Sequence, residues 1–211
     1  MNQRLAAFLV ELHANGVAHD AAQPNRLFKY RNLEPATAEL LSLVVRIAGA
    51  RRVVEIGTAN GHSTVWLAEA VGDTDGDLVT LDTVANDEAR SNLARADAVQ
   101  SGLAKRVEFR QEDGGAYLAR LADGSVDLLF LDAERVEYPS WWPHPARVLR
   151  PGGVLAIDNV LSHADEVAPF LRLLAGVSAL VGTAVAVGKG LHLVWRRGDS
   201  QGATGRGSLV S

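Results

Sequence analysis

The most informative stretch of the chain is Val53-Val54-Glu55-Ile56-Gly57-Thr58-Ala59-Asn60-Gly61-His62-Ser63. An apolar run that meets glycines and then a helical pattern predicts a strand-to-helix turn. Glycine lets the backbone come close to a ligand, and the N-terminus of the following helix attracts anionic groups. A plain tight turn without a ligand is the alternative. The dinucleotide pattern needs G-x-G-x-x-G, whereas this turn has Gly57 and Gly61 with no glycine between them, and Glu55 within the strand end.

Strand and helix patterns alternate along the rest of the chain. They predict an α/β fold with a doubly wound, mostly parallel seven-stranded sheet and a C-terminal antiparallel hairpin around Gly188-Lys189-Gly190. The hairpin departs from the dinucleotide-binding version of this fold and is typical of the Rossmann-like methyltransferase version. Residues 15–34 are expected to be irregular. The expected strands are 52–56, 78–81, 107–109, 126–131, 154–157, 184–187 and 191–195, and the expected helices are 2–14, 36–48, 62–71, 85–100, 115–121, 138–149 and 163–174.

Length and composition indicate an ordinary globular protein. The chain has 211 residues, of which 47% are hydrophobic and 22% charged, and it has no cysteine. We therefore expect a single domain over 1–197 with an N-terminal helical cap over about 1–34, followed by a flexible Gly/Ser-rich tail over 198–211. The lack of cysteine excludes disulfides and Cys-type zinc sites, and it fits a cytoplasmic protein.

Charge and hydropathy argue against two classes of partner. The net charge is −4 and no basic run exceeds two residues, so we expect no nucleic-acid partner. The longest uncharged stretch lies between Arg172 and Lys189 and contains three glycines, so we expect no membrane span.

Two acidic residues follow the second and third predicted strands. Asp82 ends the second strand, where a carboxylate can accept both hydroxyls of a ribose. Asp113 follows the third strand, where it can meet the amino group of an adenine. Helix capping is the alternative for each residue. Together with the spacing of Glu55, Gly57 and Gly61, Asp82 favours S-adenosylmethionine over NAD as the ligand.

The fourth and fifth predicted strands end in Asp132 and in Asp158-Asn159. Because these strands should be neighbours, the three side chains are expected to converge at one edge of the sheet. Two carboxylates and an amide are oxygen ligands that suit Mg²⁺. The histidines show no HxxxH or HxH pair, which disfavours zinc. Capping or Asx-turn roles for the three residues are the alternative.

These motifs resemble those of the cation-dependent O-methyltransferases of the catechol and caffeoyl-CoA type. The resemblance covers roughly residues 25–196. It rests on Glu55-Ile56-Gly57 with Gly61 and Ser63, on Asp82, on Phe130-Leu131-Asp132-Ala133, and on Leu149-Arg150-Pro151-Gly152-Gly153 leading to Asp158-Asn159. It implies methyl transfer from S-adenosylmethionine to a hydroxyl of a small catechol-like aromatic acceptor, with Mg²⁺ or another divalent cation.

The resemblance also implies roles for individual residues. Asp82 would bind the ribose, Asp113 would lie near the adenine, and Asp132, Asp158 and Asn159 would hold Mg²⁺. The methionine end of the cofactor would be held by Glu55, Gly57 and Ser63 and closed over by Asn32 and Leu33.

One position departs from the family pattern. The family has a lysine base three residues after the first metal aspartate, and this chain has Arg135 there. Arginine stays protonated in proteins, so it cannot act as that base. We expect Arg135 to orient the acceptor, with His163 as a candidate base. A surface ion pair of Arg135 with Glu134 or Glu137 is the alternative.

The sequence offers candidates for the walls of the acceptor pocket and for the quaternary structure. Candidate pocket walls are residues 26–30 together with Tyr138, Trp141, Trp142 and His144, although adjacent tryptophans more often lie in a core or an interface. The first helix is either a lid or a dimer element, and the resemblance suggests a homodimer.

The competing functions are a metal-independent methyltransferase, a catalytically degenerate S-adenosylmethionine-binding protein and, least favoured, an NAD-dependent oxidoreductase.

Overall fold

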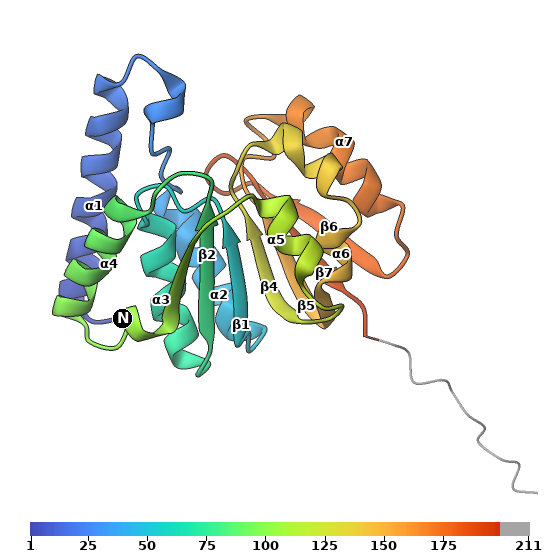
Figure 1. Ribbon diagram of the computed structural model, residues 1–211, viewed down its shortest axis with the longest axis horizontal. Coiled ribbons are helices and arrows are strands. Elements are labelled where there is room, and N and C mark those ends of the chain that lie inside the picture. Colours follow the sequence, from blue (N-terminus) through green and yellow to red (C-terminus); the bar gives the residue numbers. More distant parts are fainter. Residues whose placement is uncertain (199–211) are drawn as a thin grey trace, which may run out of the picture.

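A single seven-stranded sheet forms the centre of the computed structural model, which describes residues 1–198 (Figure 1). The strand order is β3-β2-β1-β4-β5-β7-β6. The first five strands are parallel, and β7 runs antiparallel to both β5 and β6. This confirms the predicted α/β fold and its C-terminal hairpin. From residue 199 on, the predicted tail lies outside the described residues. The strands are β1 Arg52–Ile56, β2 Asp77–Asp82, β3 Val107–Gln111, β4 Val126–Leu131, β5 Leu149–Ile157, β6 Leu180–Val185 and β7 Leu191–Arg196.

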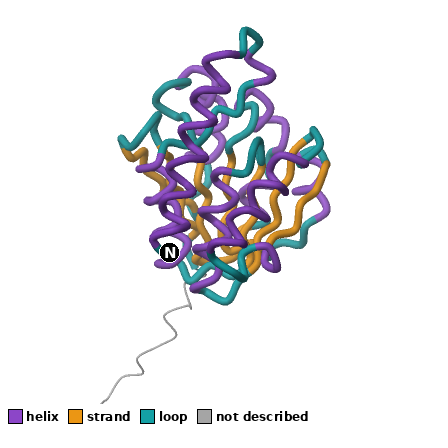
Figure 2. Tube along the Cα trace, turned by 90° about the vertical axis from the view of Figure 1, so that its left-hand side faces the viewer, coloured by secondary structure: helices purple, strands orange, loops and turns teal. Residues whose placement is uncertain are grey.

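Helices cover both faces of the sheet (Figures 1 and 2). Successive strand residues point to opposite faces, so Val53 packs in a core cluster with α2 and α3, and Val54 packs in a second cluster with α5 and α7. Because both faces are covered, the central strand β4 is buried along its whole length. The α-helices are α1 Gln3–Ala22, α2 Pro35–Ile47, α3 His62–Asp73, α4 Asp87–Val99, α5 Gly114–Arg120, α6 His144–Arg147 and α7 Ala164–Ala175, and the 3-10 helices are η1 Arg26–Phe28, η2 Ala104–Arg106 and η3 Arg135–Trp141.

The N-terminal helix is longer than predicted. It was expected to end at residue 14, but α1 continues to Ala22. Its first half buries Leu5, Leu9 and Leu12 against α3 and α4. The second half is mostly exposed, with Val17 55% exposed. The apolar stripe therefore ends before the helix does. The helix can continue without an apolar face because each further residue adds a backbone hydrogen bond.

The segment after β4 is not the single helix that was expected over 138–149. It forms η3 and the short α6, and β5 begins at Leu149. Prolines lack the N–H that a helix interior needs, and Pro139 and Pro143 interrupt this segment. Tyr138 and Trp141 are buried in the core. The core interpretation of Trp141 is thus confirmed, and Tyr138 lies in the same core cluster.

Among residues 1–198, no helix combines the length and the apolar character that crossing a membrane would require.

Candidate active site

The candidate site lies where β4 and β5 end side by side. Leu131 pairs with Ile157 in the parallel register, and Asp132 and Asp158 are the next residues on the two strands. The backbone continues this pairing, because Asp132 N–H donates to Ile56 O at 2.9 Å and Asp158 N–H donates to Leu131 O at 3.1 Å. The parallel sheet therefore brings both carboxylates to one edge.

Asn159 joins the two carboxylates. Its amide nitrogen donates to Asp132 Oδ1 at 3.0 Å and to Asp158 Oδ2 at 2.8 Å. The backbone of Asn159 is left-handed, with φ of 67°, a conformation that asparagine tolerates better than most residues. The other carboxylate oxygen of Asp158 is buried without a hydrogen-bond partner among the described residues. The three predicted ligands thus lie within hydrogen-bonding distance of one another through the Asn159 amide.

The two carboxyl groups have perturbed acidities. Burial is the main cause that raises the pKa of Asp132, against the opposing charges of Arg31, Lys189 and Arg135. Burial followed by the charge of Asp132 raises the pKa of Asp158. Because two adjacent carboxylates resist ionising together, the space between them favours a proton or a cation.

These residues fit a divalent cation. The donors are carboxylate and amide oxygens, the class that Mg²⁺ prefers, and Asp158 has a buried oxygen that no group among residues 1–198 satisfies. Within residues 1–198, no group of three or more His, Cys, Asp or Glu side chains converges. The third ligand would therefore be the Asn159 amide, turned to present its oxygen.

Glu55 lies fully buried under the turn that follows β1. Thr64 Oγ1 and Thr80 Oγ1 donate to one of its oxygens at 2.6 and 2.7 Å. Burial raises the pKa of Glu55 to about 7 against these hydroxyl hydrogen bonds. Its second oxygen is buried and has no partner in the described part of the chain. A cofactor amine would satisfy that oxygen, and Ser63 at the start of α3 is a further hydroxyl beside it.

The two glycines of this turn serve the packing of the protein itself. Gly57 has φ of 108°, and a Cβ there would collide with the backbone carbonyl of Asp132. Gly61 has φ of 83°, and a Cβ there would press on Ala89 of α4. The structure thus shows a packing reason for both glycines, the approach of β4 and α4, and close approach of a ligand to this turn remains a prediction. Gly57 thereby allows Asp132 to lie beside the turn.

Asp82 and Asp113 have different local roles. Asp82 Oδ2 accepts hydrogen bonds from the N–H groups of Thr58 and Ala59 at 3.2 and 3.1 Å, so it holds the β1–α3 turn and does not cap a helix. Asp113 caps α5, accepting from Ala116 N–H at 2.7 Å. Their proposed contacts with ribose and adenine remain predictions.

Asn32 and Leu33 lie just before α2. The Asn32 amide packs against Gly16 of α1, and both its polar atoms are buried without hydrogen-bond partners among the described residues. Leu33 is 2% exposed and belongs to the core cluster of α2 and α3. Only the Asn32 side chain therefore offers polar atoms to a ligand, and closure over the cofactor remains a prediction.

Arg135 is buried, so the surface ion pair proposed as an alternative is wrong. Its Nε and Nη2 lie 2.9 and 2.8 Å from Glu166 Oε2 on α7. Glu134, which was named as a possible partner, binds Arg26 and Arg31 instead. The guanidinium is 31 residues from its partner in the sequence, and no local pattern indicates that pairing.

His163 lies at the start of α7, between the candidate ligands and Glu166. Its N–H donates to Asn159 O at 3.0 Å, and its Nδ1 lies 2.8 Å from Ser162 Oγ. Partial burial and then the charge of Arg135 lower the pKa of His163. A neutral imidazole is what a proton acceptor needs.

Sequence reasoning missed Lys189, Thr64 and Thr80. The two threonines have no distinguishing motif, although Thr80 is paired with Glu55 in the β1–β2 register. Lys189 is at the tip of the hairpin, and its Nζ lies 2.7 Å from Glu34 Oε1. Because β7 runs antiparallel to β5, the start of β7 lies beside the end of β5. A predicted antiparallel hairpin would therefore have indicated that its tip lies at the same edge of the sheet as Asp158.

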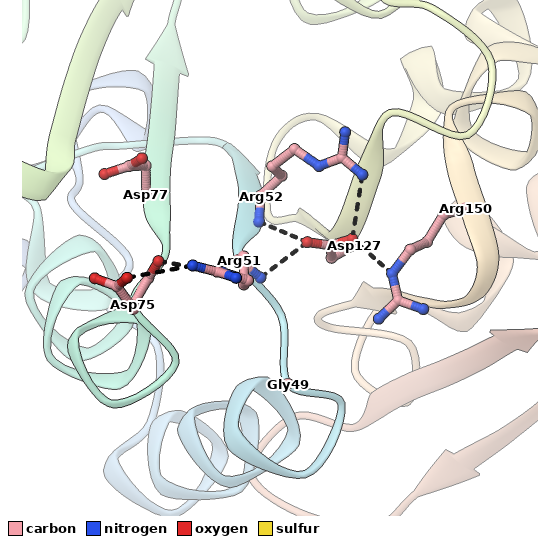
Figure 3. A pocket seen from close by; sticks show the side chains of 7 residues that line it. All are labelled: Gly49, Arg51, Arg52, Asp75, Asp77, Asp127 and Arg150. Atoms are coloured by element: carbon pink, nitrogen blue, oxygen red, sulfur yellow. Dashed lines mark hydrogen bonds and ion pairs between the residues drawn. The ribbon is translucent and has the colours of Figure 1, made fainter.

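A second charged cluster lies at the opposite edge of the sheet, in a pocket of about 550 Å³ (Figure 3). Asp127 is at its centre and accepts hydrogen bonds from Arg51, Arg52 and Arg150. Ligands of parallel α/β sheets bind at the carboxyl ends of the strands, whereas this pocket is at the amino ends. The cluster therefore joins strand starts and is not the candidate active site. Its lining residues are Gly49, Arg51, Arg52, Asp75, Asp77, Asp127 and Arg150.

Comparisons with known proteins agree with this geometry. A family described as O-methyltransferase matches residues 16–170. A protein of Mycobacterium tuberculosis described as a probable O-methyltransferase is 35% identical over 126 residues, which are 59% of this chain and 54% of that protein. The chain thus spans about half the length of the curated relatives it matches.

Solved structures are similar over almost the whole chain. The O-methyltransferase of Bacillus cereus, in complex with S-adenosylhomocysteine, has a TM-score of 0.74 and 28% identity, covering 90% of this chain and 91% of that one. The O-methyltransferase TomG of Streptomyces achromogenes, in complex with S-adenosylmethionine, has a TM-score of 0.71 and 28% identity, covering 94% and 91%. On its matched sequence and its fold, the chain belongs to the O-methyltransferase family.

Proposed function

We propose that this protein is an S-adenosylmethionine-dependent O-methyltransferase that uses a divalent cation and acts on a small catechol-like aromatic acceptor. The single observation that carries the proposal is the convergence of Asp132, Asp158 and Asn159, with one buried carboxylate oxygen left unpartnered. Family membership and the cofactor-bound neighbours support the cofactor assignment.

The cofactor fits the turn after β1. The unpartnered oxygen of Glu55 and the hydroxyl of Ser63 are the groups that would hold the methionine end, and Asp82 would face the ribose. When bound, S-adenosylmethionine supplies a methyl group on a sulfonium, from which the acceptor oxygen takes it as the carbon–sulfur bond breaks. The protein contributes mainly positioning and electrostatic stabilisation.

The acceptor fits the edge formed by Asp132, Asp158 and Asn159. These residues would hold a divalent cation, and such a cation would supply Lewis-acid stabilisation of an ionised acceptor hydroxyl. His163 is the candidate to take up the hydroxyl proton, because its lowered pKa keeps the imidazole neutral. A homodimer and a cytoplasmic location remain part of the proposal.

The test is methyl transfer to catechol and to phenol, measured by product mass. We expect methylated catechol with Mg²⁺, no product with a chelator, and no transfer to phenol. Asp158→Asn should abolish transfer, whereas the exposed Asp123→Asn should retain it. Chelator-resistant transfer would support a metal-independent methyltransferase, and cofactor binding without transfer to any acceptor would support a degenerate binding protein.

A further inference from the structure

The tip of the β6–β7 hairpin is fixed beside the candidate metal ligands. Ile157 of β5 pairs with His192 of β7 in the antiparallel register, so residues before 192 run alongside residues after 157. The N–H groups of Leu161 and Ser162 both donate to Lys189 O, at 3.0 and 3.1 Å. The backbone of Lys189 is therefore held against the segment that follows Asn159.

The side chain of Lys189 reaches the same edge. Its Nζ lies 2.7 Å from Glu34 Oε1, and the Lys189 side chain is 43% exposed. Glu34 Oε2 is buried without a hydrogen-bond partner among residues 1–198. The ammonium is thus paired with Glu34, while a large part of the Lys189 side chain is exposed to solvent.

The charge of Lys189 acts on both candidate metal carboxylates. Burial raises the pKa of Asp132 and of Asp158, and Lys189 is among the charges that oppose this rise in both. It is also among the charges that lower the pKa of His163. These contributions agree with the backbone contacts that hold the hairpin tip beside the segment following Asn159.

Arg135 is less suited to meet the acceptor. Two nitrogens of its guanidinium lie within 3 Å of Glu166 Oε2, and the residue is 3% exposed. Lys189 is also paired with a carboxylate, but its side chain is 43% exposed, whereas that of Arg135 is 4% exposed. The position at which the resemblance expects a lysine is occupied by a buried structural cation.

We propose that Lys189 supplies the cation for the acceptor: from the hairpin tip its ammonium faces the ionised acceptor oxygen, in place of the lysine missing at position 135. This inference rests on the proposed function. An ammonium near an oxyanion in a partly dry site lowers the pKa of the parent hydroxyl. Glu34 would hold the ammonium in place until an acceptor binds.

The experiment measures the ionisation of a bound acceptor analogue without turnover. The probe is 4-nitrocatechol, whose ionised form absorbs visible light, bound to protein with S-adenosylhomocysteine and Mg²⁺. The ionisation midpoint is followed by absorbance in the wild type and in Lys189→Met, Lys189→Arg, Arg135→Met and Lys105→Met. Lys105 is an exposed lysine in η2, at the other edge of the sheet, and is the matched control.

We expect the midpoint of the bound probe to rise by about one pH unit in Lys189→Met, and to stay within about 0.3 units of wild type in Lys189→Arg and Lys105→Met. An unchanged midpoint in Lys189→Met with the probe still bound would overturn the inference. A rise in Arg135→Met alone would assign the role to Arg135 and also overturn it.

The outcomes separate this inference from the proposed function. If wild type methylates catechol and Lys189→Met has a normal midpoint, only the role of Lys189 fails. If wild type neither binds the probe nor methylates catechol, the proposed function fails and the inference fails with it. Thermal unfolding of each variant checks that the hairpin is intact.

Discussion

The aspartates at the amino and carboxyl edges of the sheet have pKa values shifted in opposite directions, although Asp127 lies in β4 and Asp132 directly follows it. At the amino edge, burial alone would raise the pKa of Asp127, but hydrogen bonds from the N–H groups of Arg51 and Arg52 and from the Arg150 side chain lower it (Figure 3). At the carboxyl edge, Asp132 and Asp158 face each other, and the pKa of each is raised.

The difference lies in which partners the chain provides. Asp127 accepts hydrogen bonds from two backbone N–H groups and from the Arg150 guanidinium, so its charge is compensated and it joins the starts of β1, β4 and β5. Asp158 keeps one buried oxygen without a partner among the described residues, at a cost to stability. A buried, uncompensated carboxylate next to a second one is typical of a site that binds a ligand. The predictions that follow test this contrast, in order of decreasing effect.

The largest expected effect is on transfer at the carboxyl edge. Asp158→Asn removes a candidate cation ligand while keeping the side-chain shape, so the rate of transfer should fall at least about 100-fold. Initial rates at saturating Mg²⁺ measure it. Wild-type rates in this variant would mean that Asp158 is not a ligand.

The corresponding change at the amino edge should affect stability instead. Asp127→Ala removes three charge-assisted hydrogen bonds and should lower the free energy of unfolding by about 2 kcal/mol. The rate per folded molecule should stay unchanged, because the residue lies at the far end of β4. Urea unfolding and initial rates measure the two quantities. A loss of activity without loss of stability would contradict the contrast between the edges.

The raised pKa values of these carboxyl groups predict an unusual pH dependence of stability in the presence of a chelator. Asp158, with its pKa raised to about 8, holds a proton in the folded protein that the unfolded chain has already released above its ordinary pKa near 4. The free energy of unfolding should therefore fall as the pH rises through this interval, by about 1 kcal/mol per pH unit.

Asp158→Asn lacks this proton and should show a flatter curve between pH 5 and 7. Glu55, whose pKa is raised to about 7, contributes a similar slope to both proteins and cancels in the difference. Urea unfolding at pH 5, 6 and 7 in chelator measures both curves. Parallel curves would mean that the Asp158 carboxyl is not perturbed.

The smallest effect is expected for an exposed pair at the amino edge. Arg51 and Asp75 form an ion pair, but both side chains are more than half exposed. Arg51→Met should change the free energy of unfolding by less than about 0.5 kcal/mol, because the bond from the Arg51 backbone to Asp127 remains. A loss as large as that of Asp127→Ala would mean that the whole cluster acts as one network.

The sequence predicted most of the fold because its signals are local. Apolar runs such as Val126–Leu131 end at turns, and the acids that follow strands must meet at one edge of a parallel sheet. The errors have local causes as well. Helix α1 continues beyond its apolar stripe, and prolines divide the segment after β4 into η3 and α6.

The parts of the site that could not be predicted depend on contacts between distant segments. Glu166 forms an ion pair with Arg135, which is 31 residues away in the sequence. Lys189 forms an ion pair with Glu34, which lies near the other end of the chain. The packing reason for Gly57 could not be found from the sequence, because it lies in the position of Asp132 after another strand. Which charges are compensated and which are free is decided by tertiary packing, and only the structure reveals it.

The most direct test of the central claim is a titration of Mn²⁺, as a mimic of Mg²⁺, into protein loaded with S-adenosylhomocysteine, with free Mn²⁺ followed by electron paramagnetic resonance. The account predicts one saturable site in the wild type and in Asp123→Asn, and its loss in Asp158→Asn. No saturable binding in the wild type, or equal binding in Asp158→Asn, would contradict the assignment of the carboxyl edge as a cation site.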